Sequence, residues 1–267
     1  MKIQYQWETI QETNPLIHQI TNYVTVRDCA NITLAVGASP VMAQASEEVS
    51  EMVRISQALV LNIGTLEATL VEAMIQAGQT ANQHHVPVVL DPVGAGATSF
   101  RLNSLQTLLE KVQFTVIRGN ASEISTLCGI RAGKGVDAAG DLTSDQFEAI
   151  KQLANELKAV IAVSGAVDYI TDGSKEAHIS NGTALLTKIT GTGCMTTALI
   201  GCCLGAGIAP FESAVTSLVA MGIVGEWAEK KMDPEAIGQF HQSLFDGFGQ
   251  MNSEWLAKEG NVHVTSS

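Results

Sequence analysis

Apolar segments of two lengths alternate along the middle of this chain. Four short runs are apolar almost throughout, which is typical of strands that are buried on both faces. Longer segments between them carry apolar residues at helical spacing, as at Leu66, Leu70 and Met74. The predicted strands are residues 58–63, 86–91, 114–118 and 159–165, and the predicted helices are residues 65–85, 102–112, 121–127 and 146–157. Strands that alternate with helices predict a parallel sheet with helices on both faces.

The N-terminal part of the chain predicts a strand between helices. A short helix over residues 7–14 ends before Pro15, because the residue that precedes a proline is pushed out of helical geometry. Thr21 or Asn22 is a candidate cap for the next helix, which runs to Val36. The other predicted elements are a strand over residues 16–20, a turn over 37–40, an extended segment over 41–43, and a helix over 47–57 with Ser46 as its cap.

The C-terminal part predicts a hairpin and then helices. Asp172-Gly173 separates two extended segments, residues 167–171 and 176–180, and this dipeptide is typical of a tight antiparallel turn. Beyond residue 198 the pattern predicts only helices, with long amphipathic segments over residues 211–231 and 234–258.

No linker or internal repeat divides the chain. Residues 129–141, which mix small and charged side chains without periodicity, predict a surface loop. We therefore expect one α/β domain over residues 1–267, in which a hairpin is appended to a mainly parallel sheet.

The composition of the 267 residues excludes several classes of protein. With 46% hydrophobic and 16% charged residues, the chain is able to bury a sizeable core. Its 15 basic and 27 acidic residues give a net charge of −12, which repels nucleic acids and anionic membranes. The N-terminus lacks the apolar core of a signal peptide, and the apolar run over residues 198–209 is too short to cross a bilayer. We expect a cytoplasmic protein without a nucleic-acid or membrane partner.

The five cysteines favour reduced thiols. No two of them form a C-x-x-C pair, and their number is odd, which argues against a disulfide framework and against a zinc site. Cys202 and Cys203 lie in an apolar run and are most simply small core residues.

Polar residues or glycines stand at the carboxyl ends of four predicted strands. Gly64, Asp91, Arg118 and Ser164 each end or follow a different strand. Because open α/β sheets bind ligands at this edge, we expect these residues to line one crevice. Structural roles are the alternatives: Asp91 precedes a proline, as turn-forming aspartates do, and Arg118 is able to form a surface ion pair with Glu123.

The sequence Thr190-Gly191-Thr192-Gly193-Cys194 precedes an apolar run that is able to form a helix. The two glycines let backbone N–H groups approach a ligand closely, and the positive end of the helix favours an anion such as phosphate. A simple glycine turn before a buried helix is the alternative, because short glycine motifs are weakly specific.

Taken together, these segments fit phosphoryl transfer. That reaction requires a cation site, a positive clamp on the phosphates and backbone donors. Asp91 and Glu123 offer oxygen ligands for Mg²⁺, either directly or through water, and Arg118 is able to neutralise phosphate oxygens. A Rossmann dehydrogenase is not indicated, because no G-x-G-x-x-G follows the first strand.

Two motifs resemble those of a known superfamily. Asn120-Ala121-Ser122-Glu123 resembles the N-x-x-E motif of the ribokinase-like superfamily, and Gly191-Thr192-Gly193-Cys194 resembles its G-x-G-D motif with the last residue changed. Within that superfamily, residues 7–260 resemble the hydroxyethylthiazole kinase family, above all at 14–22, 91–96 and 191–195.

The resemblance implies a fold and a reaction. The fold would be the ribokinase-like three-layer α/β fold. The reaction would transfer the γ-phosphoryl group of ATP to the primary alcohol of 4-methyl-5-(2-hydroxyethyl)thiazole, with Mg²⁺, in thiamine biosynthesis. The resemblance also implies a homotrimer whose active sites lie at subunit interfaces.

It further implies a role for each matching residue. The residues expected to contact the thiazole are Asn22, Met42, Gly64 and Gly191. The residues expected to contact ATP are Arg118, Ser164 and Asn120, and those expected to bind the metal are Asp91 and Glu123. The catalytic turn would consist of Gly191, Gly193 and Cys194.

Cys194 stands where most ribokinase-like enzymes have an aspartate, the base that takes the alcohol proton. The N-terminus of a helix lowers the pKa of a thiol and nearby phosphates raise it, so both directions stay open. Cys194 is then either a weak base or a group that orients the hydroxyl. Two other functions also stay open: a small-alcohol kinase of the hydroxymethylpyrimidine or pyridoxal type, and a non-catalytic relative that binds a thiamine precursor.

Overall fold

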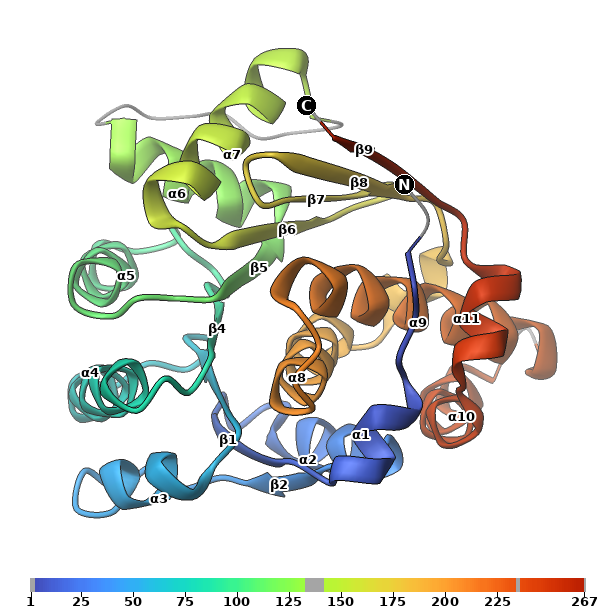
Figure 1. The fold of residues 1–267 in the computed structure, drawn as a ribbon, viewed down its shortest axis with the longest axis horizontal. Helices are drawn as coiled ribbons and strands as arrows, with labels where there is room; N and C mark the ends of the chain where they lie inside the picture. Colours follow the sequence, from blue (N-terminus) through green and yellow to red (C-terminus); the bar gives the residue numbers. More distant parts are fainter. Residues whose placement is uncertain (1–2, 133–141, 234–235, 267) are drawn as a thin grey trace.

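The computed structural model describes residues 3–132, 142–233 and 236–266, and all the strands in these ranges join one sheet (Figure 1). The nine strands are β1 (Leu16–Ile20), β2 (Ser39–Val41), β3 (Ala58–Asn62), β4 (Val88–Asp91), β5 (Val116–Asn120), β6 (Val160–Ser164), β7 (Asp168–Thr171), β8 (Lys175–Ile179) and β9 (Val262–Ser266). Their order across the sheet is β2-β1-β3-β4-β5-β6-β7-β8-β9. Neighbours from β2 to β6 are parallel, and β7, β8 and β9 continue the sheet in antiparallel pairs.

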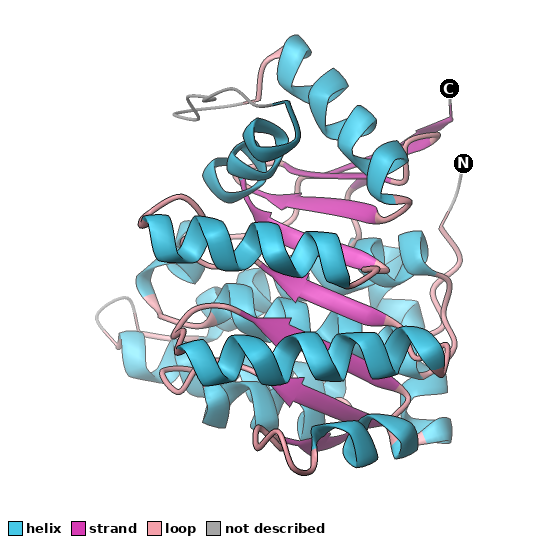
Figure 2. Ribbon diagram, turned by 90° about the vertical axis from the view of Figure 1, so that its left-hand side faces the viewer, coloured by secondary structure: helices cyan, strands magenta, loops and turns pink. Residues whose placement is uncertain are grey.

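Helices cover both faces of this sheet (Figures 1 and 2). They are α1 (Glu8–Thr13), α2 (Val26–Ala35), α3 (Val49–Ile55), α4 (Ala68–Gln83), α5 (Ser99–Lys111), α6 (Ala121–Ala132), α7 (Ser144–Leu157), the 3-10 helix η1 (Ala184–Lys188), α8 (Thr192–Gly205), α9 (Pro210–Lys231), α10 (Ile237–Gln250) and α11 (Ser253–Glu259). Helices α3 to α7 lie on one face, and α8 and α9 lie on the other with α2, α10 and α11 around them. In the part of the chain that the structure describes, no helix is both long and apolar enough to cross a membrane.

The pleat of the strands explains their apolar runs. Val60 and Val89 point to the core beneath α8 and α9, whereas Leu59, Leu61 and Leu90 point to the core beneath α3 to α7. Because both faces are buried, nearly every position in these strands must be apolar.

The register of the parallel strands aligns their carboxyl ends. Asn62 lies opposite Asp91 in the β3–β4 pair, and Asn120 lies opposite Ser164 in the β5–β6 pair. The N-terminal end of α8 reaches the same edge, where Cys194 contacts Asn62. Polar residues from separate parts of the sequence therefore meet at one edge of the sheet.

The predicted fold class, a mainly parallel α/β sheet with helices on both faces and an appended hairpin, is confirmed. The four apolar runs form β3 to β6, with boundaries that move by one or two residues. Helix α4 begins at Ala68, three residues later than predicted, and α5 begins at Ser99, three residues earlier. The Asp172-Gly173 turn joins β7 to β8 as predicted.

The predicted N-terminal caps are wrong. Helix α2 begins at Val26, and its first flanking residue is Thr25, so neither Thr21 nor Asn22 is the N-cap. Asn22 Oδ1 instead accepts hydrogen bonds from the backbone N–H and the hydroxyl of Thr25, each 3.1 Å long, and so orders the turn before the helix. Helix α3 likewise begins at Val49 after Glu48, and Ser46 lies outside it.

The prediction of an entirely helical C-terminus is also wrong. The segment 234–258 is divided where α10 ends at Gln250 and Asn252 caps α11 by accepting a 2.8 Å hydrogen bond from the Trp255 N–H. Strand β9 then adds an edge to the sheet. Of the predicted loop over residues 129–141, the first four residues belong to α6, and residues 133–141 lie outside the described residues.

Candidate active site

Asn62, the last residue of β3, is the centre of the hydrogen-bond network at the carboxyl edge of the sheet. Its Oδ1 accepts from Asn22 Nδ2 at 3.0 Å and from the Gly64 N–H at 2.9 Å. Its Nδ2 donates to Asp91 Oδ2 at 2.8 Å and to Cys194 Sγ at 3.2 Å. This buried amide therefore connects the segment after β1 with β3, β4 and α8, and its polar atoms are satisfied, as burial requires.

Asp91, at the end of β4, keeps one carboxylate oxygen free. Oδ2 accepts from Asn62 and, at 2.9 Å, from the hydroxyl of Thr197 on α8, whereas Oδ1 is buried with no hydrogen-bond partner among the described residues. Burial raises the pKa of the Asp91 carboxyl to about 6; the charge of Glu123 adds to this effect, and Arg118 opposes it. The carboxylate is mainly ionised at neutral pH and presents Oδ1 to a ligand.

Cys194, in the first turn of α8, is a hydrogen-bonded thiol. Its Sγ accepts from Asn62 Nδ2 at 3.2 Å and from Asn22 Nδ2 at 3.4 Å. Burial raises the pKa of the thiol, the negative charge of Asp91 raises it further, and these hydrogen bonds only oppose the effect. Of the two directions that the sequence left open, the surroundings of Cys194 therefore favour the raised pKa, and with it the protonated thiol.

The glycine turn before α8 has the backbone that an anion site requires. Gly191 flanks the helix with a φ of +94°, and a Cβ at this position would lie 2.8 Å from Cγ2 of Thr25. The N–H groups of the first helical turn have no partners within the helix, and the positive end of α8 faces the same space. The turn therefore offers backbone donors beside Cys194.

Arg118, on β5, closes this turn from the other side. A Cβ at Gly193 would collide with Arg118 Nη1, so only glycine lets the guanidinium lie against the helix N-terminus. Nη2 donates a 2.6 Å hydrogen bond to Ser164 Oγ on β6, and Nε is buried without a partner among the described residues. An acceptor-rich ligand such as phosphate would satisfy that free donor.

Asn120 and Glu123 form a reciprocal cap at the start of α6. Asn120 Oδ1 accepts from the Glu123 N–H at 2.9 Å, and Glu123 Oε2 accepts from the Asn120 N–H at 2.8 Å. Glu123 Oε1 accepts from the Gly94 N–H at 2.9 Å. Both carboxylate oxygens of Glu123 therefore accept hydrogen bonds from backbone N–H groups, and the bond to Gly94 holds the loop after β4 against the start of α6.

Two cavities meet at Arg118, Asn120 and Gly193. One, of about 380 Å³, is lined by Asn22, Val24, Thr25, Gly64, Asp91, Val93, Arg118, Asn120, Glu123, Thr190, Gly191, Gly193 and Cys194. The other, of about 560 Å³, extends past Ser164 to an apolar end formed by Leu186, Leu218 and Met221. The shared wall is where a group transferred from a molecule in one cavity to a molecule in the other would pass.

The structure brings most of the predicted site residues together. Ten of the eleven line these two cavities: Asn22, Gly64, Asp91, Arg118, Asn120, Glu123, Ser164, Gly191, Gly193 and Cys194. Met42 does not; it is partly buried against the core cluster beneath α8 and α9. The functional roles of all eleven stay predictions.

Sequence reasoning missed Asn62, Thr25 and Thr197. Asn62 ends β3 in the register position that Asp91 occupies in β4, and this position was a signal that could have identified it. Thr25 and Thr197 lie within or beside helices, and the sequence contains no comparable sign of their contacts with Asn22 and Asp91.

Solved structures share this fold. The structure of a hydroxyethylthiazole kinase protein from Pyrococcus horikoshii OT3 has a TM-score of 0.88 and 38% sequence identity, with 97% of each chain covered. A ribokinase-like superfamily protein from Enterococcus faecalis V583 has a TM-score of 0.64 at 13% identity, which shows a common fold alone. The identity and coverage of the Pyrococcus horikoshii match, together with the shared fold, place the protein in a class of α/β kinases.

The sequence comparisons define the family within that class. The profile of the hydroxyethylthiazole kinase family matches residues 7–254. A hydroxyethylthiazole kinase from Thermoanaerobacter sp. strain X514 is 49% identical over 257 residues, which cover 96% of this chain and 97% of that protein. The chain belongs to the hydroxyethylthiazole kinase family.

Proposed function

We propose that the chain phosphorylates the primary hydroxyl of 4-methyl-5-(2-hydroxyethyl)thiazole with ATP, as a step of thiamine biosynthesis. The observation that carries the proposal is the junction of the two cavities at Arg118 and Gly193. The larger cavity, with its apolar end and Ser164, would take ATP, and the smaller one, beside Asn22, Gly64 and Gly191, would take the thiazole. The family membership supports this substrate.

An ADP-release assay tests the proposal. Hydroxyethylthiazole is expected to give ADP, whereas hydroxymethylpyrimidine and pyridoxal are expected to give only the background rate. ADP release with a pyrimidine or pyridoxal alcohol in place of the thiazole would assign a different small-alcohol kinase. Binding of the thiazole without ADP release from any alcohol would indicate a non-catalytic binding protein.

In the proposed reaction, the residues at the junction of the two cavities would have different roles. Arg118 and the N-terminal N–H groups of α8 would stabilise charge on the transferring group, because both are preorganised and aimed at the shared wall. In the loose transition state of this reaction the attacking hydroxyl keeps its proton until late. A protonated Cys194 would therefore orient the hydroxyl, and positioning would supply most of the rate.

Asp91 and Glu123 fit a Mg²⁺ ion. Asp91 contributes a buried Oδ1 that has no hydrogen-bond partner in the described part of the chain, and Glu123 contributes a second carboxylate that accepts from two backbone N–H groups. Among the described residues, no cluster of three His, Cys, Asp or Glu side chains forms a complete metal centre. Two carboxylates suit Mg²⁺, because this ion prefers oxygen ligands and keeps part of its water. Phosphates of the substrate would complete its coordination, and the ion would neutralise part of their charge.

Cys194→Ser is expected to keep the maximal rate within about tenfold of the wild type, because an orienting hydroxyl replaces an orienting thiol while a true base is worth about 10² to 10⁴ in rate. Cys194→Asp provides the comparison, since it restores the residue of most ribokinase-like enzymes. Both are measured at saturating ATP and thiazole. Complete loss in Cys194→Ser with no gain in Cys194→Asp would show that the thiolate is essential.

We also propose a homotrimer in which Met42 contacts the thiazole bound by a neighbouring copy. Met42 lies outside the 380 Å³ cavity of its own chain, in the segment after β2, the strand at one edge of the sheet. Sedimentation equilibrium under assay conditions tests this proposal, and a monomer with full activity would contradict it.

We further propose that the chain is one domain, consistent with its single sheet, and that it acts in the cytoplasm. All five cysteines are free thiols, which suits a reducing compartment.

A further inference from the structure

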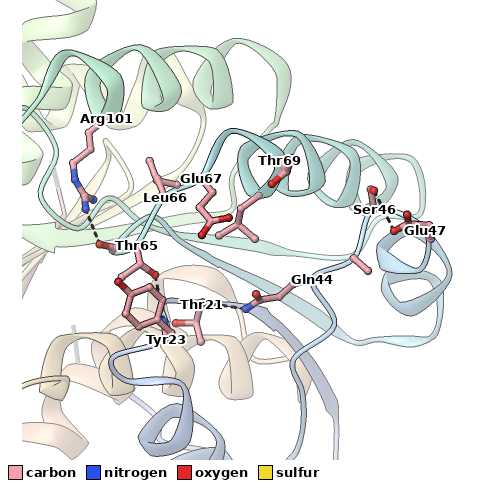
Figure 3. A pocket seen from close by; sticks show the side chains of 13 residues that line it. Thr21, Tyr23, Gln44, Ser46, Glu47, Thr65, Leu66, Glu67, Thr69 and Arg101 are labelled. Carbon is pink, nitrogen blue, oxygen red and sulfur yellow. Dashed lines mark hydrogen bonds between the residues drawn. The ribbon is translucent and has the colours of Figure 1, made fainter.

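Arg101, in the first turn of α5, joins the loops that follow β3 and β4. Its guanidinium donates to three backbone carbonyl oxygens: Nη1 to Ile63 and to Val93, the latter at 2.9 Å, and Nη2 to Gly64 at 2.7 Å. Figure 3 shows this side chain reaching from its helix to the backbone beside Thr65. These three bonds tie two separate loops together, so the side chain has a structural role beyond that of a solvated surface charge.

The guanidinium of Arg101 bonds the backbone just beyond the end of the β3–β4 pair. The β3–β4 ladder closes with Asn62 opposite Asp91, and one more bond, from the Ile63 N–H to the Asp91 carbonyl, continues it. Beyond that point, Arg101 bridges the carbonyls of the two diverging loops. Only a planar fork with several fixed donors makes such a bridge, because the ammonium of lysine is a single point on a flexible stem.

Each bridged loop leads to a group of the candidate active site. On one side, Gly64 donates its N–H to Asn62, which holds Cys194. On the other, Gly94, the neighbour of Val93, donates its N–H to Glu123. Gly94 has a φ of +68°, and a Cβ placed there would lie 3.6 Å from Arg101 Nη1, an ordinary van der Waals distance, so the guanidinium lies beside this turn.

We propose that Arg101 is a positioning residue for phosphoryl transfer: it sets the thiazole-side loop and the metal-side loop at the spacing that the reaction requires. The proposal rests on the proposed function and extends it to a residue that touches neither substrate. Arg118 and Ser164, the predicted ATP contacts, lie on β5 and β6 and have no bond to Arg101 among the contacts of the described residues. Losing Arg101 should therefore act on the alcohol more than on ATP.

Kinetics of Arg101→Ala and Arg101→Lys test this proposal. Both variants are expected to lose about 10- to 100-fold in kcat/KM for the thiazole alcohol, because displacements of about 1 Å reduce rates to that extent, while KM for ATP stays within about twofold. Guanidinium ion at millimolar concentration should restore part of the activity of Arg101→Ala, and ammonium at the same ionic strength should not. Arg54→Ala, an exposed arginine at the end of α3, is the matched control and should behave as the wild type.

The outcomes separate the two proposals. A wild-type protein that releases no ADP with the thiazole would contradict the proposed function itself. If the wild type is active and the folded Arg101 variants keep its kcat/KM, the role of Arg101 is overturned. It is also overturned if the variants raise KM for both substrates in proportion to a lower melting temperature and guanidinium does not restore their activity. If Arg101→Ala does not fold, Arg101→Lys, which keeps the aliphatic stem and the charge, decides the question by the same ratio of kinetic constants.

Discussion

Asp91→Asn is expected to lower kcat by about 10² to 10³, because it removes a preorganised charge from the proposed site of phosphoryl transfer. The replacement is nearly isosteric. In the wild type, Asp91 Oδ2 accepts hydrogen bonds from Asn62 and Thr197, and Oδ1 has no partner within the described ranges, so Oδ1 is the oxygen available to a ligand. Steady-state kinetics with the thiazole alcohol and ATP measure the effect. Asp145→Asn, at an exposed position of α7, is the control, and a kcat of the wild-type size in Asp91→Asn would contradict the assignment.

The same substitution is expected to stabilise the fold at high pH. Burial raises the pKa of Asp91 to about 6 in the folded state, above the value of about 3.9 for an unfolded aspartate. Between these values the folded protein binds more protons than the unfolded chain, so the wild type loses stability as pH rises through that range. The melting temperature of Asp91→Asn minus that of the wild type should thus be larger at about pH 8 than at about pH 4. The opposite order would mean that the charged carboxylate is favoured by its surroundings.

Arg118→Met is expected to lower kcat/KM for ATP by about 10² to 10³, because the proposed charge clamp on the transferring phosphoryl group is lost while a side chain of similar length remains. The guanidinium lies against Gly193, donates a hydrogen bond to Ser164, and has no partner for Nε among the described residues. Arg118→Lys keeps the charge without the fork and should lie between the wild type and Arg118→Met.

Initial rates over a range of ATP concentrations measure this effect, and the ordering of the three proteins is the decisive result. Arg54→Met serves as the control for loss of an arginine at an exposed site. If Arg118→Lys has the same kcat/KM for ATP as the wild type, the positive charge alone is sufficient and the planar fork of the guanidinium plays no part. If Arg118→Met keeps its kcat/KM for ATP, the nucleotide does not bind at the shared wall of the two cavities.

Each feature that was found from the sequence is a local one. Strands β3 to β6 were predictable because burial on both faces leaves almost no polar residue within them. The glycine turn was predictable because glycine is the residue that readily adopts the left-handed backbone of position 191. The elements that were missed carry no such local sign: β9 is a mostly exposed edge strand, and the break at Asn252 interrupts an otherwise continuous helical pattern.

By itself, the sequence therefore determined the fold class, the order of the central elements and ten of the residues that line the site. Periodicity and strand-end position, which are properties of neighbouring residues, indicated the fold class and the strand-end residues, and the glycine motif and the resemblance to a known family indicated the others. Only the tertiary structure decided that one amide, Asn62, holds both Asp91 and Cys194, and that burial raises the pKa of the Cys194 thiol. It also decided that Arg101 bridges two loops. Hydrogen-bond partners and the burial that shifts a pKa are set by groups distant in the chain, and only the folded arrangement brings those groups into contact.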